Sequence, residues 1–375
     1  MKYIAYYDVE DNAVQRRKYF LSATNKIDYI CKVLIGLEND VEIISVAETQ
    51  NNKFYLGKTI KLYNNFSYKL FPTIPARNKV FRLLGRWFMQ TCLSLYLVFH
   101  TKKNEEMIVY HSVGYGNAIH LAKRIKKFKV ILEVEEIYQD VSSLGKKKDK
   151  REYRDFEDAD KYIFPTEMLN DKINKTNKPY AIIHGTYQVE PDRGERFDDD
   201  KIHVVYAGTF DPRKGGAAAA AAAVRLPSNY HLHILGFGNK EDTENLKKII
   251  EETNAKAEAT VTYDGLLSGE DYIKFIQKCH IGLSTQNPDA DFNATSFPSK
   301  ILSYMANGLR VVSIRIPAIE TSDIGEDMYY YDNQTPEEIA KAIMSVDLND
   351  EYDSRKKIEQ LDEKFKKNLL DMLNV

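Results

Sequence analysis

Residues 202–224 read Ile-His-Val-Val-Tyr-Ala-Gly-Thr-Phe-Asp-Pro-Arg-Lys-Gly-Gly, then seven alanines and a valine, and this stretch decides the fold. The first six residues are mostly β-branched or aromatic, which is typical of a strand. The alanines are the strongest helix formers available. Residues 208–216 between them, with three glycines and a proline, cannot form a regular element. The stretch therefore predicts a strand, a glycine-rich loop and a helix.

Such a loop is suited to an anion. Glycine lets backbone N–H groups approach a ligand closely, and the N-terminus of the following helix contributes about half a positive charge. Lys214 adds a full positive charge beside it. A phosphate-bearing ligand is the natural occupant. The alternative is an ordinary strand-to-helix turn with solvated basic residues.

Length and composition indicate a globular protein of two domains. The chain has 375 residues, which is too long for one ordinary core. Of these residues, 43% are hydrophobic and 29% are charged, a composition typical of a globular protein. Cys31, Cys92 and Cys279 lie far apart without paired spacing, so neither a disulfide framework nor a zinc site is expected. They fit buried thiols in a reducing cytoplasm. Residues 1–8 contain too short an apolar run for a signal peptide and predict a first strand.

The net charge of −2 hides an asymmetry between the two halves. Residues 1–190 contain 31 Lys and Arg against 23 Asp and Glu, a net charge of +8, and the remainder carries −10. Three basic clusters lie in the first half: Arg77, Lys79, Arg82 and Arg86; Lys123, Arg124, Lys126, Lys127 and Lys129; and Lys146, Lys147, Lys148, Lys150, Arg151 and Arg154. They form either solvated helix faces or a basic surface that attracts an anionic membrane or a diphosphate-linked acceptor. No nucleic-acid-binding pattern accompanies them, so nucleic acid is not expected as a partner.

The chain alternates strands and helices in both halves, which predicts parallel sheets with right-handed crossovers. In the first half we expect strands at 3–7, 41–46, 107–110, 130–134, 162–165 and 180–183, a hairpin region at 51–69, and helices at 13–35, 80–99 and 117–126. In the second half we expect strands at 202–207, 231–235, 261–263, 281–284 and 309–314, and helices at 217–223, 242–253, 269–278, 300–307 and 350–373. Residues 191–200 are polar and predict a linker.

The apolar helix at 80–99 resembles a membrane span, but Arg82 and Arg86 interrupt it. Its uncharged part, 87–99, is shorter than the roughly 20 residues that a span needs. We expect a buried or interfacial helix, packed in the core or docked on a membrane.

Polar residues follow two strands of the first half. His111 follows one of them, and Glu133, Glu135 and Glu136 end another. Ligands bind at the carboxyl ends of parallel strands. The acidic group is either a solvated rim or a set of carboxylates whose repulsion raises one pKa and prepares a general base.

Four segments of the second half, taken in order, resemble the carboxy-terminal domain of group-1 (family 4 type) retaining glycosyltransferases. They are Tyr206–Gly215, similar to the family's Gly-Arg-Leu…Lys-Gly loop; Leu235–Gly238, similar to its Gly-x-Gly turn; Val261–Leu266, similar to its hydrophobic-x-hydrophobic-x-Gly segment; and Phe297–Ser313, similar to its donor-binding helix. The resemblance covers about a third of the chain.

The resemblance implies a GT-B fold, with two Rossmann-like doubly wound parallel-sheet domains facing each other across a cleft. It divides the chain into an acceptor-side domain at 1–190, a nucleotide-sugar-binding domain at 191–349, and a helix at 350–375 that crosses back to the first domain. It implies catalytic roles for Lys214, Glu135 and His111. The donor-binding residues that it implies are Gly208, Thr209, Arg213, Gly236, Phe237, Gly238, Gly265, Leu266, Ser296, Phe297, Pro298, Ser299, Lys300 and Ser303.

The sequence departs from the family pattern at several of these positions. Thr209 stands where the family has arginine, so Lys214 must carry more of the diphosphate charge, with Arg213. Thr295 and Ser303 replace the family's paired glutamates, and Lys300 is expected to compensate as a phosphate contact. Glu135 stands where many members have histidine, and residues 8–17 replace the glycine-rich first loop. Asp289-Ala290-Asp291 has the spacing of a metal motif but lies in a loop, so no metal is expected.

The expected activity is transfer of a hexose from a nucleotide diphosphate sugar, a UDP-sugar by preference, to a saccharide acceptor, without cofactor or metal and with retention. The expected acceptor is lipid-linked, with a polyprenyl diphosphate as the carrier, in surface polysaccharide or glycoconjugate assembly. The chain would work in the cytoplasm, in peripheral contact with the inner face of the plasma membrane. The alternatives are a nucleotide-sugar epimerase or hydrolase of the same fold, and a non-catalytic glycosyltransferase-like partner subunit.

Overall fold

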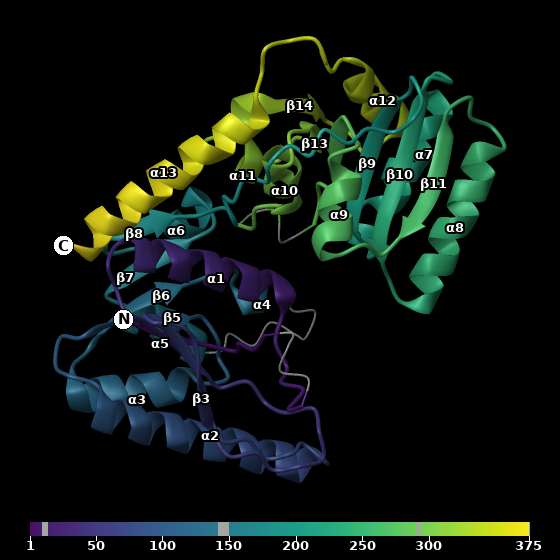
Figure 1. Cartoon of the computed structure of the whole chain (residues 1–375). Helices are drawn as coiled ribbons and strands as arrows, with labels where there is room; N and C mark the ends of the chain where they lie inside the picture. Colours follow the sequence, from purple (N-terminus) through teal and green to yellow (C-terminus); the bar gives the residue numbers. More distant parts are fainter. Residues whose placement is uncertain (10–13, 142–149, 291–292, 294, 375) are drawn as a thin grey trace. The chain divides into compact units, whose positions relative to one another are not determined.

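The computed structural model describes residues 1–9, 14–141, 150–290, 293 and 295–374. The chain forms two compact α/β units (Figure 1). The first unit comprises Met1–Ile183 and Phe365–Val375, and the second comprises His184–Lys364. The first unit therefore ends before the domain boundary expected at residue 190. The last helix, α13 (Ser354–Leu373), begins in the second unit and ends in the first.

The first unit contains an eight-stranded sheet in the order β3-β4-β2-β1-β5-β6-β7-β8. Only β3 is antiparallel, where it forms a hairpin with β4. The strands are β1 (Lys2–Ala5), β2 (Val41–Ser45), β3 (Lys58–Tyr63), β4 (Phe66–Leu70), β5 (Glu106–Tyr110), β6 (Lys129–Glu133), β7 (Lys161–Phe164) and β8 (Tyr180–Ile182). The predicted parallel sheet and its hairpin region are confirmed.

Helices cover both faces of this sheet (Figure 1). They are α1 (Leu21–Gly36), α2 (Lys79–His100), α3 (Gly116–Lys126), α4 (Tyr138–Val141), α5 (Lys150–Asp158) and α6 (Glu167–Ile173). One core lies between the sheet and the α2–α3–α5 layer, and its fully buried members include Ile4, Leu93 and Phe128. On α1, Tyr29 stacks on Phe365 of α13 with ring centroids 5.9 Å apart.

Helix α1 begins at Leu21, so the helix expected from residue 13 was wrong at its start. Arg17 explains the difference. Its buried guanidinium donates hydrogen bonds to the carbonyl oxygens of Ala47 (2.6 Å) and Phe71 (2.8 Å), and residue 17 forms an isolated bridge with Thr49. These long-range bonds hold the segment outside the helix and override its local helical pattern.

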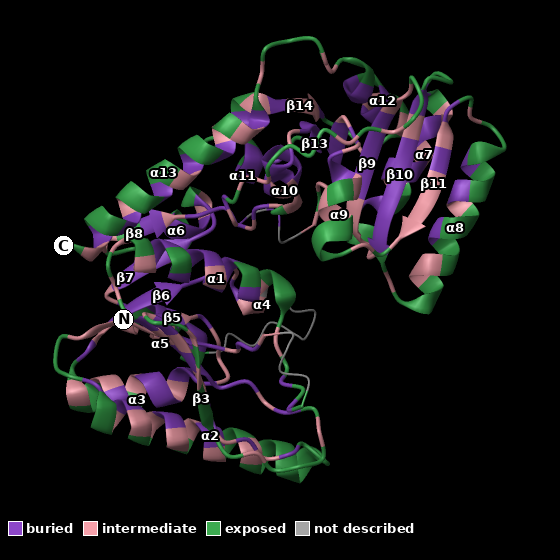
Figure 2. Ribbon diagram, in the orientation of Figure 1, coloured by how far each residue is buried: buried purple, intermediate pink, exposed green. Residues whose placement is uncertain are grey.

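Helix α2 forms as predicted but buries only a narrow stripe, Met89, Leu93 and Leu97. Figure 2 shows one end of α2 exposed around the helix. The large apolar side chains that it exposes are Val80, Phe81, Leu83, Leu84, Trp87, Leu95 and Phe99. In the described parts of the chain, none of the helices has the length and apolar character needed to cross a membrane.

The second unit contains a six-stranded, fully parallel sheet in the order β11-β10-β9-β12-β13-β14. Its strands are β9 (Ile202–Thr209), β10 (Tyr230–Phe237), β11 (Thr260–Gly265), β12 (Ile281–Ser284), β13 (Arg310–Ile314) and β14 (Met328–Tyr331). Numbered within the unit, this order is 3-2-1-4-5-6, the doubly wound Rossmann order.

The helices of the second unit alternate with its strands, as predicted. They are α7 (Gly216–Ala222), α8 (Lys240–Asn254), α9 (Gly269–Ile276), α10 (Lys300–Ala306), α11 (Pro317–Glu320) and α12 (Pro336–Met344). Short 3₁₀ turns lie at Pro212–Lys214, Ala223–Arg225 and Gly325–Asp327. Helices α7, α8 and α12 pack together, and the buried Ala219 and Ala220 allow α7 to lie close against β9 and β10.

Candidate functional site

The second sheet reverses its strand order between β9 and β12, and ligands bind in doubly wound folds at this switch point. The loop after β9, residues 208–216, contacts the loop after β12. Thr285 Oγ1 donates a hydrogen bond to the carbonyl oxygen of Gly215 (2.7 Å). The backbone N–H of Asn287 donates one to the carbonyl oxygen of Arg213 (2.9 Å). The glycine-rich loop thus lies at the switch point of its sheet.

Two glycines are required for this close approach. Gly215 has φ +83°, and a Cβ there would lie 1.6 Å from the carbonyl oxygen of Thr285. Gly236 has φ +133°, and a Cβ there would lie 1.7 Å from the carbonyl oxygen of Gly208. Only glycine fits at both positions, because the backbone of the 208–216 loop lies too close to Thr285 and to Gly236 to leave room for a side chain.

Lys300, at the start of α10, places a buried ammonium beside this loop. Its Nζ lies 4.1 Å from the centroid of the Tyr206 ring and would lie 3.5 Å from a Cβ on Gly208. Within the described chain, this buried Nζ has no hydrogen-bond partner. Burial, with a smaller contribution from the positive charge of Lys214, lowers the pKa of Lys300 to about 7. A bound anion would restore the charge of this ammonium.

The two basic residues of the glycine loop differ in their surroundings. Arg213 forms an exposed ion pair with Asp211 (2.6 Å), whose hydrogen bond raises the pKa of Arg213. Lys214 is half-buried, and its backbone carbonyl lies 3.0 Å from the hydroxyl of Tyr206. The same hydroxyl lies 3.0 Å from the carbonyl oxygen of Thr209. Tyr206, which the sequence analysis did not single out, therefore holds both ends of the turn.

Other donor-side residues predicted from the sequence lie at the same edge of the sheet, at the carboxyl ends of β10 and β11 or just after them. Gly238 follows β10, where a Cβ would meet that of Phe210 at 2.9 Å. The Phe237 side chain is exposed there, as is Leu266 after β11. Gly265 has φ +83°, with open space around the position of a Cβ.

Residues Ser296, Phe297, Pro298 and Ser299 lead into α10. The Phe297 ring stacks on His184 with centroids 4.6 Å apart. On α10, Ser303 Oγ lies 3.0 Å from the hydroxyl of Tyr272. A hydroxyl can form more than one hydrogen bond, so Ser303 keeps capacity for a ligand. Thr295 is buried.

The first unit has a switch point of its own, between β1 and β5, and a pocket of about 560 Å³ lies there. Its lining combines cations and exposed apolar side chains: Lys18, Arg86, Arg151, Phe20, Leu83 and Trp87, with Tyr6, Glu48, Gln90, Ser112, Val113, Gly114 and Asn117. The Nε atom of Arg86 lies 3.8 Å from Glu48. This pocket can hold a polar ligand that carries an anionic or an apolar group.

The acidic residues at the end of β6 and just after it form a partly buried network. The Tyr3 hydroxyl donates a hydrogen bond to Glu133, and Lys26 Nζ donates to Glu135 at 2.5 Å and to the carbonyl oxygen of Ile183 at 3.0 Å. Burial raises the pKa of Glu133 to about 8, against the opposing charge of Lys26. The sequence-based interpretation of one carboxylate with a raised pKa therefore applies to Glu133, with burial as its main cause.

His111 is buried, with only 2% of its surface exposed. Its ring stacks on Tyr138 (centroids 4.9 Å apart), and its Nε2 lies 3.6 Å from Glu152. Burial lowers the pKa of His111 to about 4, so the ring is neutral at pH 7. The catalytic roles of His111 and Glu135, which lie in the first unit, and of Lys214, which lies in the second, stay predictions. Two sequence features, Lys146–Lys148 and Asp291 of the Asp-Ala-Asp segment, lie outside the described residues.

Two Rossmann-like units make this a GT-B fold, and solved structures that match the whole chain confirm that prediction. Residues 201–347 match the model of the family described as glycosyl transferases group 1, so the resemblance found in the sequence is confirmed over that part. No curated protein sequence matches the chain.

Three of the similar solved structures illustrate the match. A trehalose-6-phosphate synthase, described for glycosyltransfer with retention, gives a TM-score of 0.68 at 11% identity, covering 100% of this chain and 99% of its own. The lipopolysaccharide outer core galactosyltransferase WaaB gives 0.65 at 14% identity, covering 99% and 98%. HepE of Anabaena, in complex with UDP, gives 0.66 at 12% identity, covering 100% and 99%. At these identities the likeness establishes the fold.

Proposed function

We propose that the chain is a glycosyltransferase that moves a hexose from a UDP-sugar to a saccharide acceptor. The observation that carries this proposal is the buried Nζ of Lys300 beside Gly208, at the switch point of the second sheet. It suits the diphosphate of a nucleotide sugar, because a buried cation is stabilised by an anion. The family match over 201–347 and the UDP bound to HepE support this choice of donor.

The chemistry follows from where charge develops. As the glycosidic C–O bond breaks, negative charge grows on the leaving diphosphate, and cations fixed in advance stabilise the transition state more than the ground state. Lys300 and Lys214 would supply that stabilisation, together with backbone N–H groups of the 208–216 loop. Retention and independence of a metal form part of the proposal, and the synthase described for transfer with retention supports the former.

The pocket in the first unit is proposed as the acceptor site. Trp87 and Phe20 offer apolar faces for a sugar ring or a lipid segment, while Lys18, Arg86 and Arg151 suit a diphosphate. This combination supports a polyprenyl-diphosphate-linked saccharide as acceptor, in the assembly of a surface polysaccharide or glycoconjugate. The exposed apolar and basic side chains of α2 would hold the protein at the cytoplasmic face of the membrane.

The test is a thermal-shift screen against UDP-, GDP-, dTDP- and ADP-sugars, followed by product analysis. A ligand at 100 times its dissociation constant raises the free energy of unfolding by about 2.7 kcal/mol, which such a screen detects. We expect the UDP-sugar to give the largest shift and a glycosylated product to appear when acceptor is added. Turnover without acceptor would indicate a hydrolase or epimerase, and no binding of any nucleotide sugar would indicate a non-catalytic subunit.

A further inference from the structure

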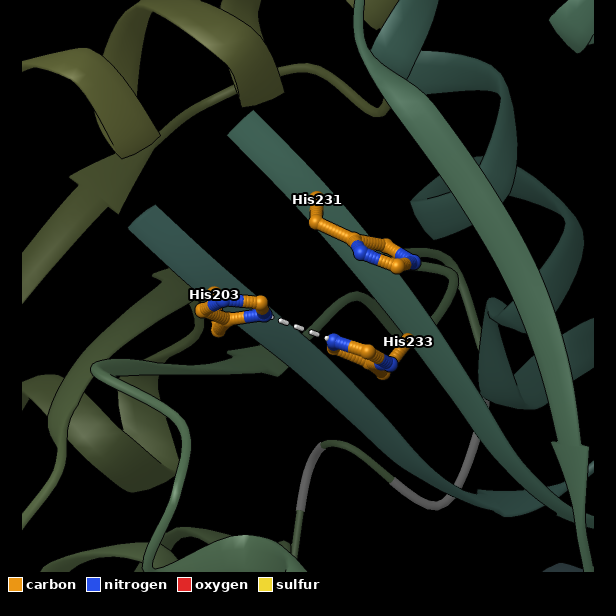
Figure 3. Close-up of side chains that lie close together, drawn as sticks. All are labelled: His203, His231 and His233. Atoms are coloured by element: carbon orange, nitrogen blue, oxygen red, sulfur yellow. Dashed lines mark hydrogen bonds between the residues drawn. The ribbon is translucent and has the colours of Figure 1, made fainter. Parts of the chain in front are cut away.

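Three histidines come together in the second unit, near the amino ends of β9 and β10 (Figure 3). His203 and His231 are register partners on the two strands, and His233 follows two residues later on the same face. One ring nitrogen from each of the three lies within 4.8 Å of the others. His203 lies six residues before the end of β9, so the cluster is about 20 Å along that strand from the proposed donor loop, residues 208–216.

The outer nitrogens of two of these rings are held by carboxylates. His203 Nε2 lies 2.7 Å from Asp199 Oδ1, and His233 Nδ1 lies 3.2 Å from Asp264 Oδ2. A carboxylate only accepts hydrogen bonds, so both outer nitrogens carry the proton. The inner nitrogens, His203 Nδ1 and His233 Nε2, then face each other at 2.9 Å with their lone pairs. Two lone pairs at this distance repel unless a cation or a proton lies between them.

The third histidine is oriented by a hydroxyl. The Thr262 hydroxyl donates to Asp264 (2.8 Å), so its oxygen accepts from His231 Nε2 at 3.1 Å. His231 therefore keeps Nδ1 as its acceptor nitrogen. Hydrogen bonds of this kind fix the tautomer and direction of histidines that bind metals, and a carboxylate behind the ring is the usual partner.

The surroundings of this cluster suit a metal ion. A metal requires rings with a free lone pair, and the hydrogen bonds to Asp199 and Asp264 leave the inner nitrogens of His203 and His233 as acceptors. The Phe197 ring stacks on His203 with centroids 4.0 Å apart and on His233 with centroids 4.9 Å apart, which excludes water from one side. Asp199 is exposed and gives an ion a route from solvent.

We propose that His203, His231 and His233 form a binding site for a divalent transition-metal ion, with Zn²⁺ as the best match. Imidazole nitrogens bind zinc at about 2.0–2.1 Å, and tetrahedral geometry then places two of them about 3.3 Å apart. The inner nitrogens of His203 and His233 need to separate by only a few tenths of an ångström from 2.9 Å. The ion would tie β9 to β10 and leave the donor end of the sheet untouched.

The neighbouring His280 is not a ligand in this proposal. Its Nδ1 accepts a hydrogen bond from the backbone N–H of His203 (3.0 Å), and that nitrogen is therefore occupied. The absence of a metal expected from the sequence rested on cysteine spacing and on the Asp289–Asp291 segment, neither of which includes these histidines.

The test is a titration of the metal-free full-length chain, without a polyhistidine tag, with Co²⁺ followed by visible absorption and then displaced by Zn²⁺. We expect one saturable site, and a rise in the melting temperature with Zn²⁺. Asp264→Asn should weaken binding about 10- to 100-fold, as loss of such a partner does elsewhere. Half-buried His231→Gln should weaken it without unfolding the chain, and His120→Gln, in the first unit, is the matched control.

The wild-type titration decides the outcome even if His203 or His233 variants fail to fold. A wild-type chain that binds no more Co²⁺ or Zn²⁺ than His231→Gln would overturn the proposal and indicate a proton shared by His203 and His233. Binding of a UDP-sugar before and after chelation is measured in parallel. We expect it to be unchanged, so that failure of this site and failure of the proposed glycosyl transfer are distinguishable.

Discussion

The Nζ atom of Lys300 lies 4.1 Å from the centroid of the Tyr206 ring, buried against an aromatic face. The ring offers weak compensation for a desolvated ammonium, worth about 1–2 kcal/mol. A phosphate would offer far more. The pKa of Lys300, lowered to about 7 mainly by burial, shows the cost of holding this charge in the ligand-free protein.

This pKa predicts how donor affinity depends on pH. A bound diphosphate favours the charged amine and raises its pKa, so binding takes up a proton when the pH is above about 7. UDP-sugar affinity should therefore fall as pH rises from 7 to 9, by up to about tenfold per unit. Calorimetry in buffers of different ionisation enthalpy measures the proton uptake. Lys300→Gln should bind more weakly and without this dependence, and an equally steep dependence in that variant would refute the assignment.

The same group predicts a trend in stability without ligand. The folded-state pKa of Lys300 is below the usual value of 10.5, so the unfolded chain binds more protons between pH 7 and 10.5. The contribution of Lys300 to the free energy of unfolding therefore rises with pH across that window. The free energies of unfolding of the wild type and of Lys300→Met, measured by urea denaturation, should converge or cross as pH increases. Curves that stay parallel from pH 7 to 10 would contradict the lowered pKa.

Lys214 and Arg213 are adjacent, which gives a matched pair of substitutions. Lys214→Ala should reduce turnover about a hundredfold or more, corresponding to a loss of about 3 kcal/mol of transition-state stabilisation. Arg213 already forms an ion pair with Asp211, so Arg213→Ala should have a much smaller effect. Steady-state kinetics of both variants, with circular dichroism to check folding, make the comparison. Equal losses in the two variants would remove the special role of Lys214.

Gly215 and Gly265 share φ +83° but differ in their surroundings, and this separates backbone strain from steric exclusion. Gly265→Ala has open space and should cost only about 1 kcal/mol of unfolding free energy, for the left-handed conformation. Gly215→Ala would place a Cβ 1.6 Å from the carbonyl oxygen of Thr285, so it should cost several times more and abolish donor binding. Urea denaturation measures both. Similar losses would mean that the two loops move apart readily.

The sequence was sufficient for the fold because its signals were local. Strand, glycine and helix alternate through the second half, and the predicted strands and helices all form, with ends shifted by a few residues. The largest shift is at the start of the helix expected over 13–35, which begins only at Leu21 because Arg17 bonds to Ala47 and Phe71, residues that are distant in sequence. Such bonds leave no local pattern.

The sequence could predict the candidate donor loop but not its most unusual cation. The sequence predicts a phosphate contact at Lys300, but the burial of Lys300 against Tyr206 depends on α10 and β9 meeting in space. The histidine cluster was missed for the same reason. His231 and His233 show the spacing of one strand face, but His203 joins them only through the register of β9 with β10.

Helix α2 presents its large apolar side chains to solvent, and these, with the basic cluster at its start, predict reversible binding to anionic membranes. The exposed group includes Val80, Leu83 and Trp87, while Arg77, Lys79, Arg82 and Arg86 supply charge beside them. Each basic side chain near an anionic surface contributes about 1 kcal/mol, and salt screens it within about 10 Å at 0.1 M. Vesicles of mixed neutral and anionic lipid should therefore sediment the protein at low salt and release it as salt rises.

Two variants separate the charged and apolar contributions to this binding. Replacing Arg77, Lys79, Arg82 and Arg86 with glutamine should abolish most of the binding and its salt dependence. Leu83→Ser with Trp87→Ser should weaken binding at every salt concentration, because burial of their apolar surface does not depend on screening. Both should leave UDP-sugar binding unchanged, since the proposed donor-binding residues lie in the second unit. If the wild type stays in the supernatant at low salt, the apolar face of α2 does not bind membranes and the acceptor is a soluble saccharide.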